Sequence, residues 1–207
     1  MDFDIPAEVV AYLDVLDGFI TSEIEPLQAQ DDNERFFDHR REHARTDWDN
    51  DGLPRQEWED LLGDMRRLAD TAGHYRFALP ADVGGSDGTN LQMAIIREHL
   101  ATRGLGLHND LQNETSIVGN HPFIKMMIAK GTDAQKAEFI EASLTGKRRV
   151  AFGLTEPNHG SDATHLEATA VKDGDEWVIN GDKRFNTGMH HATHDMVYVR
   201  TSGEAGD

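Results

Sequence analysis

The stretch Phe152–Asp162, Phe-Gly-Leu-Thr-Glu-Pro-Asn-His-Gly-Ser-Asp, carries the most information in this sequence. It begins as a short β-rich run and then turns through glycine, proline and hydrogen-bonding side chains. Such a turn can present backbone N–H groups and the Ser161 hydroxyl to an anion, as phosphate-binding nests do. A structural β-turn with an Asx cap accounts for the same residues equally well, so both interpretations stand at this point.

The sequence around this stretch predicts a second half built from short strands. The β-rich runs are 150–155, 166–171, 177–179 and 196–200, and the turn pairs Asp173-Gly174 and Asn180-Gly181 separate them. Residues 201–207 have the composition of a surface loop that leads toward another strand. We therefore expect an antiparallel, barrel-like β-domain that is incomplete.

Upstream of this half, apolar residues recur at helical spacing. Between residues 6 and 30 they fall three or four positions apart, which predicts one long helix with a single buried stripe. Further helices are expected at 56–73, 90–104, 111–118, 123–130 and 133–144. The predicted fold class is therefore α+β, with an all-α domain over 1–148 and a β-domain over 149–207.

Composition and charge exclude several classes of protein. The 207 residues contain 38 Asp and Glu against 20 Lys and Arg, for a formal net charge of -18. Nucleic acids and anionic membrane surfaces are polyanions, so neither is expected as a partner. The absence of cysteine excludes disulfides, thiolate metal sites and a cysteine nucleophile. The N-terminus lacks the basic region of a secretory signal, and no apolar run approaches the roughly 20 residues of a membrane helix, so we expect a cytoplasmic protein without membrane insertion.

Four motifs together resemble those of the acyl-CoA dehydrogenase family. Residues 155–162 resemble its Thr-Glu-Pro-x-x-Gly-Ser-Asp signature. Residues 173–183 resemble its hairpin, in which a strand is followed by Asn-Gly-x-Lys, and they stand at the family's distance from the first motif. Residues 79–85 are similar to its Pro-x-x-x-Gly-Gly loop, and residues 131–136 to its Gly-Thr-x-x-Gln-Lys helix start. Ordered motifs at matching distances arise by chance much less often than one motif alone. The resemblance extends from about residue 50 onward.

The resemblance implies that the first motif belongs to an FAD site. Phe152, Leu154 and Thr155 would lie along the flavin, with the Thr155 hydroxyl or amide at the pyrimidine end of the isoalloxazine. Gly160 and Ser161 would complete the turn, with Ser161 facing both the FAD pyrophosphate and the thioester-bearing substrate. Donors at the pyrimidine end are chemically reasonable because a reduced flavin gains negative charge there.

A second flavin segment is implied at Phe185, Asn186 and Thr187. The family has an aromatic residue, an aliphatic residue and Thr at the matching positions, so Phe185 would cover a ring face and Thr187 would donate to the flavin nitrogen that accepts hydride. Asn186 departs from the pattern and would place a polar group beside the ring system. Without the neighbouring motifs, an ordinary strand end would be the favoured interpretation of these residues.

The reaction implied by the resemblance is the α,β-dehydrogenation of an acyl-CoA thioester in fatty acid metabolism. Electrons would pass to FAD and then to an electron-transfer flavoprotein, and the full-length protein would be a homodimer or homotetramer. The family's base is a glutamate in a C-terminal helical domain beyond Asp207, so no catalytic residue is assigned in this chain, which is expected to be inactive alone. The alternatives are a flavin-dependent oxidase or monooxygenase on the same scaffold, and a non-catalytic fragment.

Two patterns that suggest metal binding are set aside. Residues 47–52, Asp-Trp-Asp-Asn-Asp-Gly, match the opening of an EF-hand calcium loop, but Trp58 stands where that loop needs a bidentate Glu. An acidic loop between helices is favoured instead. His191 and His194 have His-x-x-His spacing next to His190, but no further ligand stands at a known distance from them, which favours a loop beside the flavin. No metal is expected.

Overall fold

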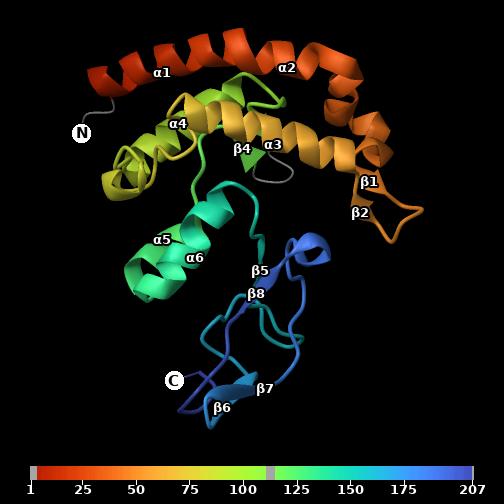
Figure 1. Cartoon of the computed structure of the whole chain (residues 1–207), viewed down its shortest axis with the longest axis vertical. Helices are drawn as coiled ribbons and strands as arrows, with labels where there is room; N and C mark the ends of the chain where they lie inside the picture. Colours follow the sequence, from red (N-terminus) through yellow and green to blue (C-terminus); the bar gives the residue numbers. More distant parts are fainter. Residues whose placement is uncertain (1–3, 111–114, 207) are drawn as a thin grey trace. The chain divides into compact units, whose positions relative to one another are not determined.

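The computed structural model describes residues 4–110 and 115–206, which form helices followed by a few short strands (Figure 1). The fold class is α+β, as predicted. The chain divides into two compact units, Met1–Asp133 and Ala134–Asp207. Within the described residues, no helix is both long and apolar enough to cross a bilayer.

The first unit begins with the long helix expected over residues 6–30. It consists of α1 Ala7–Phe19, the π-helical turn η1 Ile20–Ile24 and α2 Glu25–Ala29, which follow one another without a break. Its apolar stripe is buried at Val9, Leu13, Leu16, Phe19, Ile20 and Ile24. The stripe follows from the spacing of three and four, which keeps these side chains on one face of the helix.

The unit contains further helical elements. They are α3 Gln56–Thr71, α4 Asn90–Thr102 and α5 Pro122–Lys130, together with the 3-10 segments η2 Gln30–Phe37, η3 His39–Ala44 and η4 Ala81–Val83. Of these, α3 and α4 contribute buried residues to the same apolar core as the stripe. Thr89 begins α4 with a capping box, in which its hydroxyl accepts from the Gln92 N–H and the Gln92 side chain accepts from the Thr89 N–H. Met65, Ile96 and Leu100 are fully buried and join the stripe in one apolar core.

Short hairpins occupy two places in this unit. Strands β1 Thr46–Asp47 and β2 Leu53–Pro54 pair around the acidic loop, whose turn uses left-handed backbone at Asp51 and Gly52. Strands β3 Asn109–Asp110 and β4 Thr115–Ser116 also pair antiparallel. The helix predicted at 111–118 is therefore wrong over 115–118, and its residues 111–114 lie outside the described part. Ile117 and Val118 follow β4 and are buried in the core without being helical. A short apolar run does not by itself distinguish such a segment from a helix.

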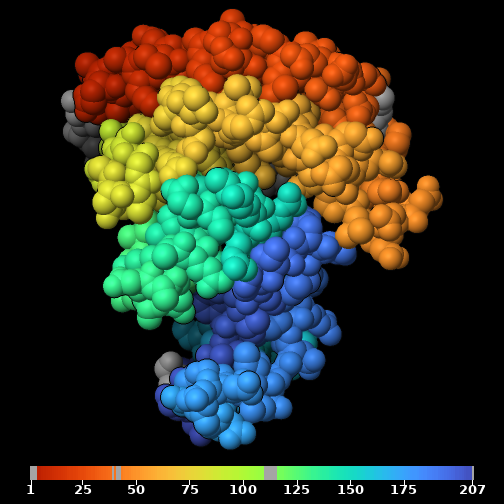
Figure 2. Space-filling model, viewed as in Figure 1, coloured from red at the N-terminus to blue at the C-terminus, as the bar shows by residue number. Residues whose placement is uncertain are grey.

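The second unit contains α6 Asp133–Leu144 and four strands. Strands β6 Thr169–Asp173 and β7 Glu176–Asn180 form the predicted antiparallel hairpin, with Asp173 opposite Glu176. Its apolar residues Val171, Trp177, Val178 and Ile179 are between 48% and 63% exposed. Figure 2 shows this light-blue hairpin at the molecular surface.

The other strand pair corrects the prediction of an entirely antiparallel domain. Strands β5 Val150–Gly153 and β8 His194–Val197 run parallel, with Val150 opposite His194. A parallel pair needs a crossover of about a dozen residues or more, and residues 154–193 supply one. The strands of this unit, as far as the chain is described, form two separate pairs and do not close into a barrel.

Candidate functional site

The two segments that the sequence singles out lie side by side in the second unit. Strand β5 leads into the turn at 156–162, and residues 183–188 return next to it. The Arg184 N–H donates to the Thr155 carbonyl at 2.8 Å, and Phe152 forms an isolated antiparallel bridge with Thr187. Backbone contacts therefore fix the relative position of segments that are about thirty residues apart in the sequence.

The turn after β5 has the hydrogen bonds of a tight reversal. The Glu156 N–H donates to the His159 carbonyl at 3.0 Å. Asp162 Oδ1 accepts from the Thr164 N–H at 3.2 Å and from its hydroxyl at 2.7 Å, which is an Asx turn. These bonds from Thr164 lower the pKa of Asp162. Gly160 and Ser161 are exposed beside it. The structure thus contains an Asx turn here, and the binding of a phosphate by this turn stays a prediction.

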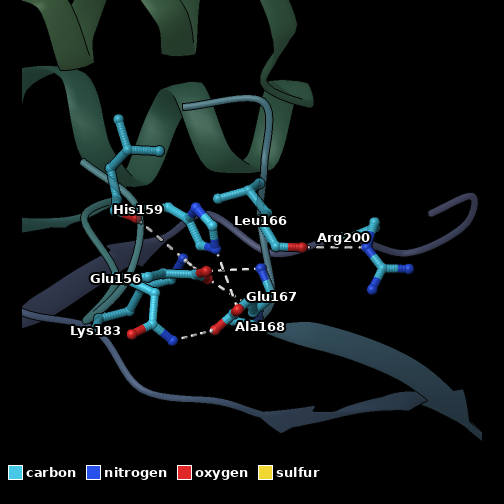
Figure 3. A network of polar contacts seen from close by, with 9 residues as sticks. Glu156, His159, Leu166, Glu167, Ala168, Lys183 and Arg200 are labelled. Carbon is cyan, nitrogen blue, oxygen red and sulfur yellow. Dashed lines mark hydrogen bonds and ion pairs between the residues drawn. The ribbon is translucent and has the colours of Figure 1, made fainter. Parts of the chain in front are cut away.

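A buried ion pair joins this turn to the second segment (Figure 3). Lys183 Nζ lies 2.7 Å from Glu156 Oε1 and donates to the Leu154 carbonyl at 3.1 Å. The two side chains are only 8% and 2% exposed, respectively. Glu156 also accepts from the N–H groups of Glu167, at 2.6 Å, and Ala168, at 2.8 Å. Three stretches of chain therefore converge on one carboxylate.

The electrostatics of Glu156 follow from these contacts. Burial alone would raise the pKa of its carboxyl group. The hydrogen bond from Lys183 and the backbone N–H groups of Glu167 and Ala168 outweigh that effect and lower the pKa to about 2. The carboxylate therefore stays charged throughout the neutral range and is unsuited to accept a proton there.

Sequence reasoning missed this pair, although both residues lie within recognised motifs. Glu156 is the glutamate of the Thr-Glu-Pro signature, and Lys183 ends the Asn-Gly-x-Lys hairpin. Opposite charges in two motifs predicted to share a site are a usable signal, because a buried charge needs a partner. Around the pair, His159 Nε2 lies 3.1 Å from Glu167 Oε1, and Arg200 donates to the Leu166 carbonyl at 3.2 Å (Figure 3).

The second segment alternates between outward and inward side chains. Phe185 is 83% exposed, and Thr187 is exposed too. The Asn186 amide between them turns inward and donates to Asp195 Oδ2 at 2.8 Å. The segment lines an open depression of about 620 Å³, formed by Lys183, Phe185, Asn186, Thr187, Gly188, Met189 and His190.

The neighbouring histidines do not form a metal centre. Throughout residues 4–110 and 115–206, no group of three or more histidine, aspartate or glutamate side chains is placed to hold a metal ion. His194 is engaged elsewhere: its ring packs edge-on against Phe139, with centroids 5.0 Å apart, and its Nε2 lies 3.3 Å from Arg148 Nη1.

The site residues fit a planar cofactor with a polar edge. An exposed aromatic face at Phe185 can cover a ring, and the Thr187 hydroxyl donates to the Phe185 carbonyl over 3.5 Å, a long and weak hydrogen bond. Phe152, whose backbone pairs with Thr187, is 44% exposed. An apolar surface flanked by a few available donors is the usual composition of a cofactor pocket.

Comparisons with known proteins match nearly the whole chain. Residues 8–147 match the family model of the acyl-CoA dehydrogenase N-terminal domain, and residues 151–207 match that of the middle domain. A (2S)-methylsuccinyl-CoA dehydrogenase of Cereibacter sphaeroides is 33% identical over 181 residues, which cover 86% of this chain and 30% of that protein. The CarC subunit of the caffeyl-CoA reductase-Etf complex of Acetobacterium woodii is 31% identical, with coverage of 72% and 37%. The chain thus spans about a third of the length of these relatives.

Solved structures of acyl-CoA dehydrogenases share this fold. A probable acyl CoA dehydrogenase from Mycobacterium abscessus superposes with a TM-score of 0.65 at 27% identity, over 97% of this chain and 46% of that one. A glutaryl-CoA dehydrogenase from Mycobacterium smegmatis in complex with FADH2 shares the fold, with a TM-score of 0.63 at 19% identity, over 96% of this chain and 44% of that one. With two matched domain models in the family's order, the chain belongs to the acyl-CoA dehydrogenase family of FAD-dependent oxidoreductases.

Proposed function

We propose that this chain supplies the flavin-facing part of an FAD-dependent acyl-CoA dehydrogenase, with a domain boundary at residues 148/149. The observation that carries the proposal is the close pairing of the two segments, through Arg184 to Thr155 and Phe152 to Thr187. The proposed flavin-binding residues are Phe152, Leu154, Thr155, Gly160, Ser161, Phe185, Asn186 and Thr187, and Ser161 is also proposed to contact the substrate.

The two segments would have different tasks. Thr155, which is half-buried two residues after the end of β5, would place a donor where the reduced cofactor carries negative charge. Phe185 would cover the ring face and Thr187 would present its hydroxyl at the ring edge. FAD supplies the hydride-accepting chemistry when bound, and the protein orients it and excludes water. Asn186 contributes from the inward side of the segment.

The proposed reaction is the α,β-dehydrogenation of an acyl-CoA thioester. The proposed electron acceptor is an electron-transfer flavoprotein, in line with the relative from the caffeyl-CoA reductase-Etf complex. The proposed assembly of the full-length protein is a homodimer or homotetramer. The dehydrogenase and the oxidase interpretations differ in whether the reduced protein passes electrons to such an acceptor or to oxygen, so the acceptor must be tested directly.

Reconstitution with FAD tests the proposal. The full-length protein that carries this sequence is expected to bind FAD and turn yellow, and Phe185→Ala is expected to weaken the affinity between about two- and tenfold, because aromatic contacts contribute about 0.5–1.5 kcal/mol beyond area burial. Trp177→Ala is the matched control, since Trp177 is an exposed aromatic on the β6–β7 hairpin, outside both segments. Absence of bound flavin, or equal losses in both variants, would contradict the assignment.

A further inference from the structure

Phe185 has a backbone conformation that its side chain disfavours. Its φ is 58°, in the left-handed region that glycine adopts freely and bulky residues avoid. Residues in such conformations cost free energy and persist only where the surroundings over-determine them. Phe185 is also 83% exposed, so packing of its own ring does not supply that constraint. The constraint must come from the residues on either side.

The chain is held firmly on both sides of Phe185. Before it, the Arg184 N–H donates to the Thr155 carbonyl, and Lys183 is buried in the ion pair with Glu156. After it, the Asn186 side chain donates to Asp195 Oδ2 in β8 at 2.8 Å, and the Asn186 carbonyl accepts from the Met189 N–H at 3.1 Å. The strained residue thus lies between two fixed points.

The Asn186–Asp195 bond depends on the absence of a side chain at Gly153. A Cβ atom at Gly153 would lie 3.1 Å from Asn186 Nδ2 and 3.1 Å from Asp195 Oδ2, tighter than most real contacts. Strand β5, the Phe185 segment and strand β8 therefore meet at this one pair. Among the described residues, buried Asn186 Oδ1 and Asp195 Oδ1 have no hydrogen-bond partner. The link between the two side chains therefore depends on the hydrogen bond from Asn186 Nδ2 to Asp195 Oδ2.

We propose that Asn186 and Asp195 are positioning residues that hold Phe185 in its strained conformation and keep Phe185 and Thr187 facing outward. An aliphatic residue at position 186 would place the segment by packing alone, whereas the polar pair fixes it by a directed bond to β8. The consequence for flavin binding rests on the proposed function, but the backbone consequence does not. Breaking the pair should release the segment while leaving the rest of the unit folded.

The experiment uses an exchange of the two side chains. Asn186→Asp places two carboxylates against each other with almost no change in volume, and Asp195→Asn added to it restores an amide-to-carboxylate bond with the partners reversed. In the apo protein, hydrogen exchange of the amides at 184–189 should be about tenfold faster in Asn186→Asp, as expected when a hydrogen bond to a charged group is lost. It should return to within about twofold of wild type in the exchanged pair. Exchange in the β6–β7 hairpin should not change.

FAD affinity provides the second measurement. It should fall about tenfold in Asn186→Asp and recover in the exchanged pair. Unchanged hydrogen exchange in the β6–β7 hairpin distinguishes this loss from general destabilisation of the unit. If Asn186→Asp fails to fold, the same substitution is made together with Phe185→Gly. Glycine accepts the left-handed conformation without strain, so the double variant should fold. Wild-type behaviour of Asn186→Asp, or an exchanged pair as impaired as the single variant, would overturn the proposal. A wild-type protein that binds no FAD but keeps the hydrogen-exchange pattern would overturn only the proposed function.

Discussion

Lys183→Met is expected to destabilise the unit Ala134–Asp207 by about 3–5 kcal/mol, because removing one member of a buried ion pair leaves the other charge uncompensated. Glu156 would keep its two backbone donors but lose its cation, while its side chain stays only 2% exposed. The free energy of unfolding of this unit, read from hydrogen exchange in the β6–β7 hairpin, measures the effect.

Two further variants serve as controls for Lys183→Met. Lys172→Met makes the same chemical change at an exposed lysine of β6 and should alter the free energy of unfolding by no more than about 0.5 kcal/mol. Glu156→Gln combined with Lys183→Met removes both charges and should cost less than Lys183→Met alone, since no unpaired charge then remains buried. Equal effects of Lys183→Met and Lys172→Met would show that the ion pair does not hold this turn.

Acid should weaken the same unit in a defined range of pH. The pKa of Glu156 is about 2 in the folded protein, below its usual value of 4.5, so the stability that its charge contributes is complete above pH 4.5. That contribution is lost as the pH falls from 4.5 toward 2, because the unfolded chain binds the proton first. The difference in free energy of unfolding between wild type and Glu156→Gln should shrink across this range, and a constant difference would contradict the assignment of the pKa.

The helices could be predicted from the sequence because their signals are local. Spacings of three and four along residues 6–30 place the same side chains on one face whatever the rest of the chain does, and Thr89 with Gln92 forms a cap within four residues. The β6–β7 hairpin is local too, since its turn lies between adjacent strands. Pairing between β5 and β8 is not local, and no periodicity within either strand specifies a parallel partner about forty residues away.

In the candidate site, too, the local features could be predicted from the sequence and those that depend on distant residues could not. Motifs at fixed spacing pointed to the segments at 152–161 and 185–187, and the structure brings strand β5 and the second segment together through the bridge between Phe152 and Thr187. The sequence did not reveal which way Asn186 turns, because that depends on Asp195 arriving from β8 and on the missing side chain at Gly153. The left-handed conformation of Phe185 was equally hidden, since aromatic residues rarely adopt it.

Thr187→Val is expected to slow flavin reduction by an acyl-CoA substrate at least tenfold while leaving the melting temperature nearly unchanged. Stability should be kept because valine has the same shape and β-branching, the bridge to Phe152 uses only backbone, and the lost hydroxyl bond at 3.5 Å is weak. The rate should fall because a donor that strengthens its contact as charge develops acts on the transition state more than on binding. Loss of one such donor costs about 2.7–4 kcal/mol in well-studied oxyanion sites, which is the upper limit here.

Thr187→Ser is the matched control, because it keeps the hydroxyl and removes only the methyl group. The comparison belongs to single-turnover reduction of the flavin, since steady-state turnover can be limited by product release. Thr187→Ser should reduce its flavin at close to the wild-type rate, and Thr187→Val should not. If both variants reduce the flavin as fast as wild type, the hydroxyl has no part in the reaction. Thr187 would then serve only through its backbone, as the residue that pairs the second segment with β5.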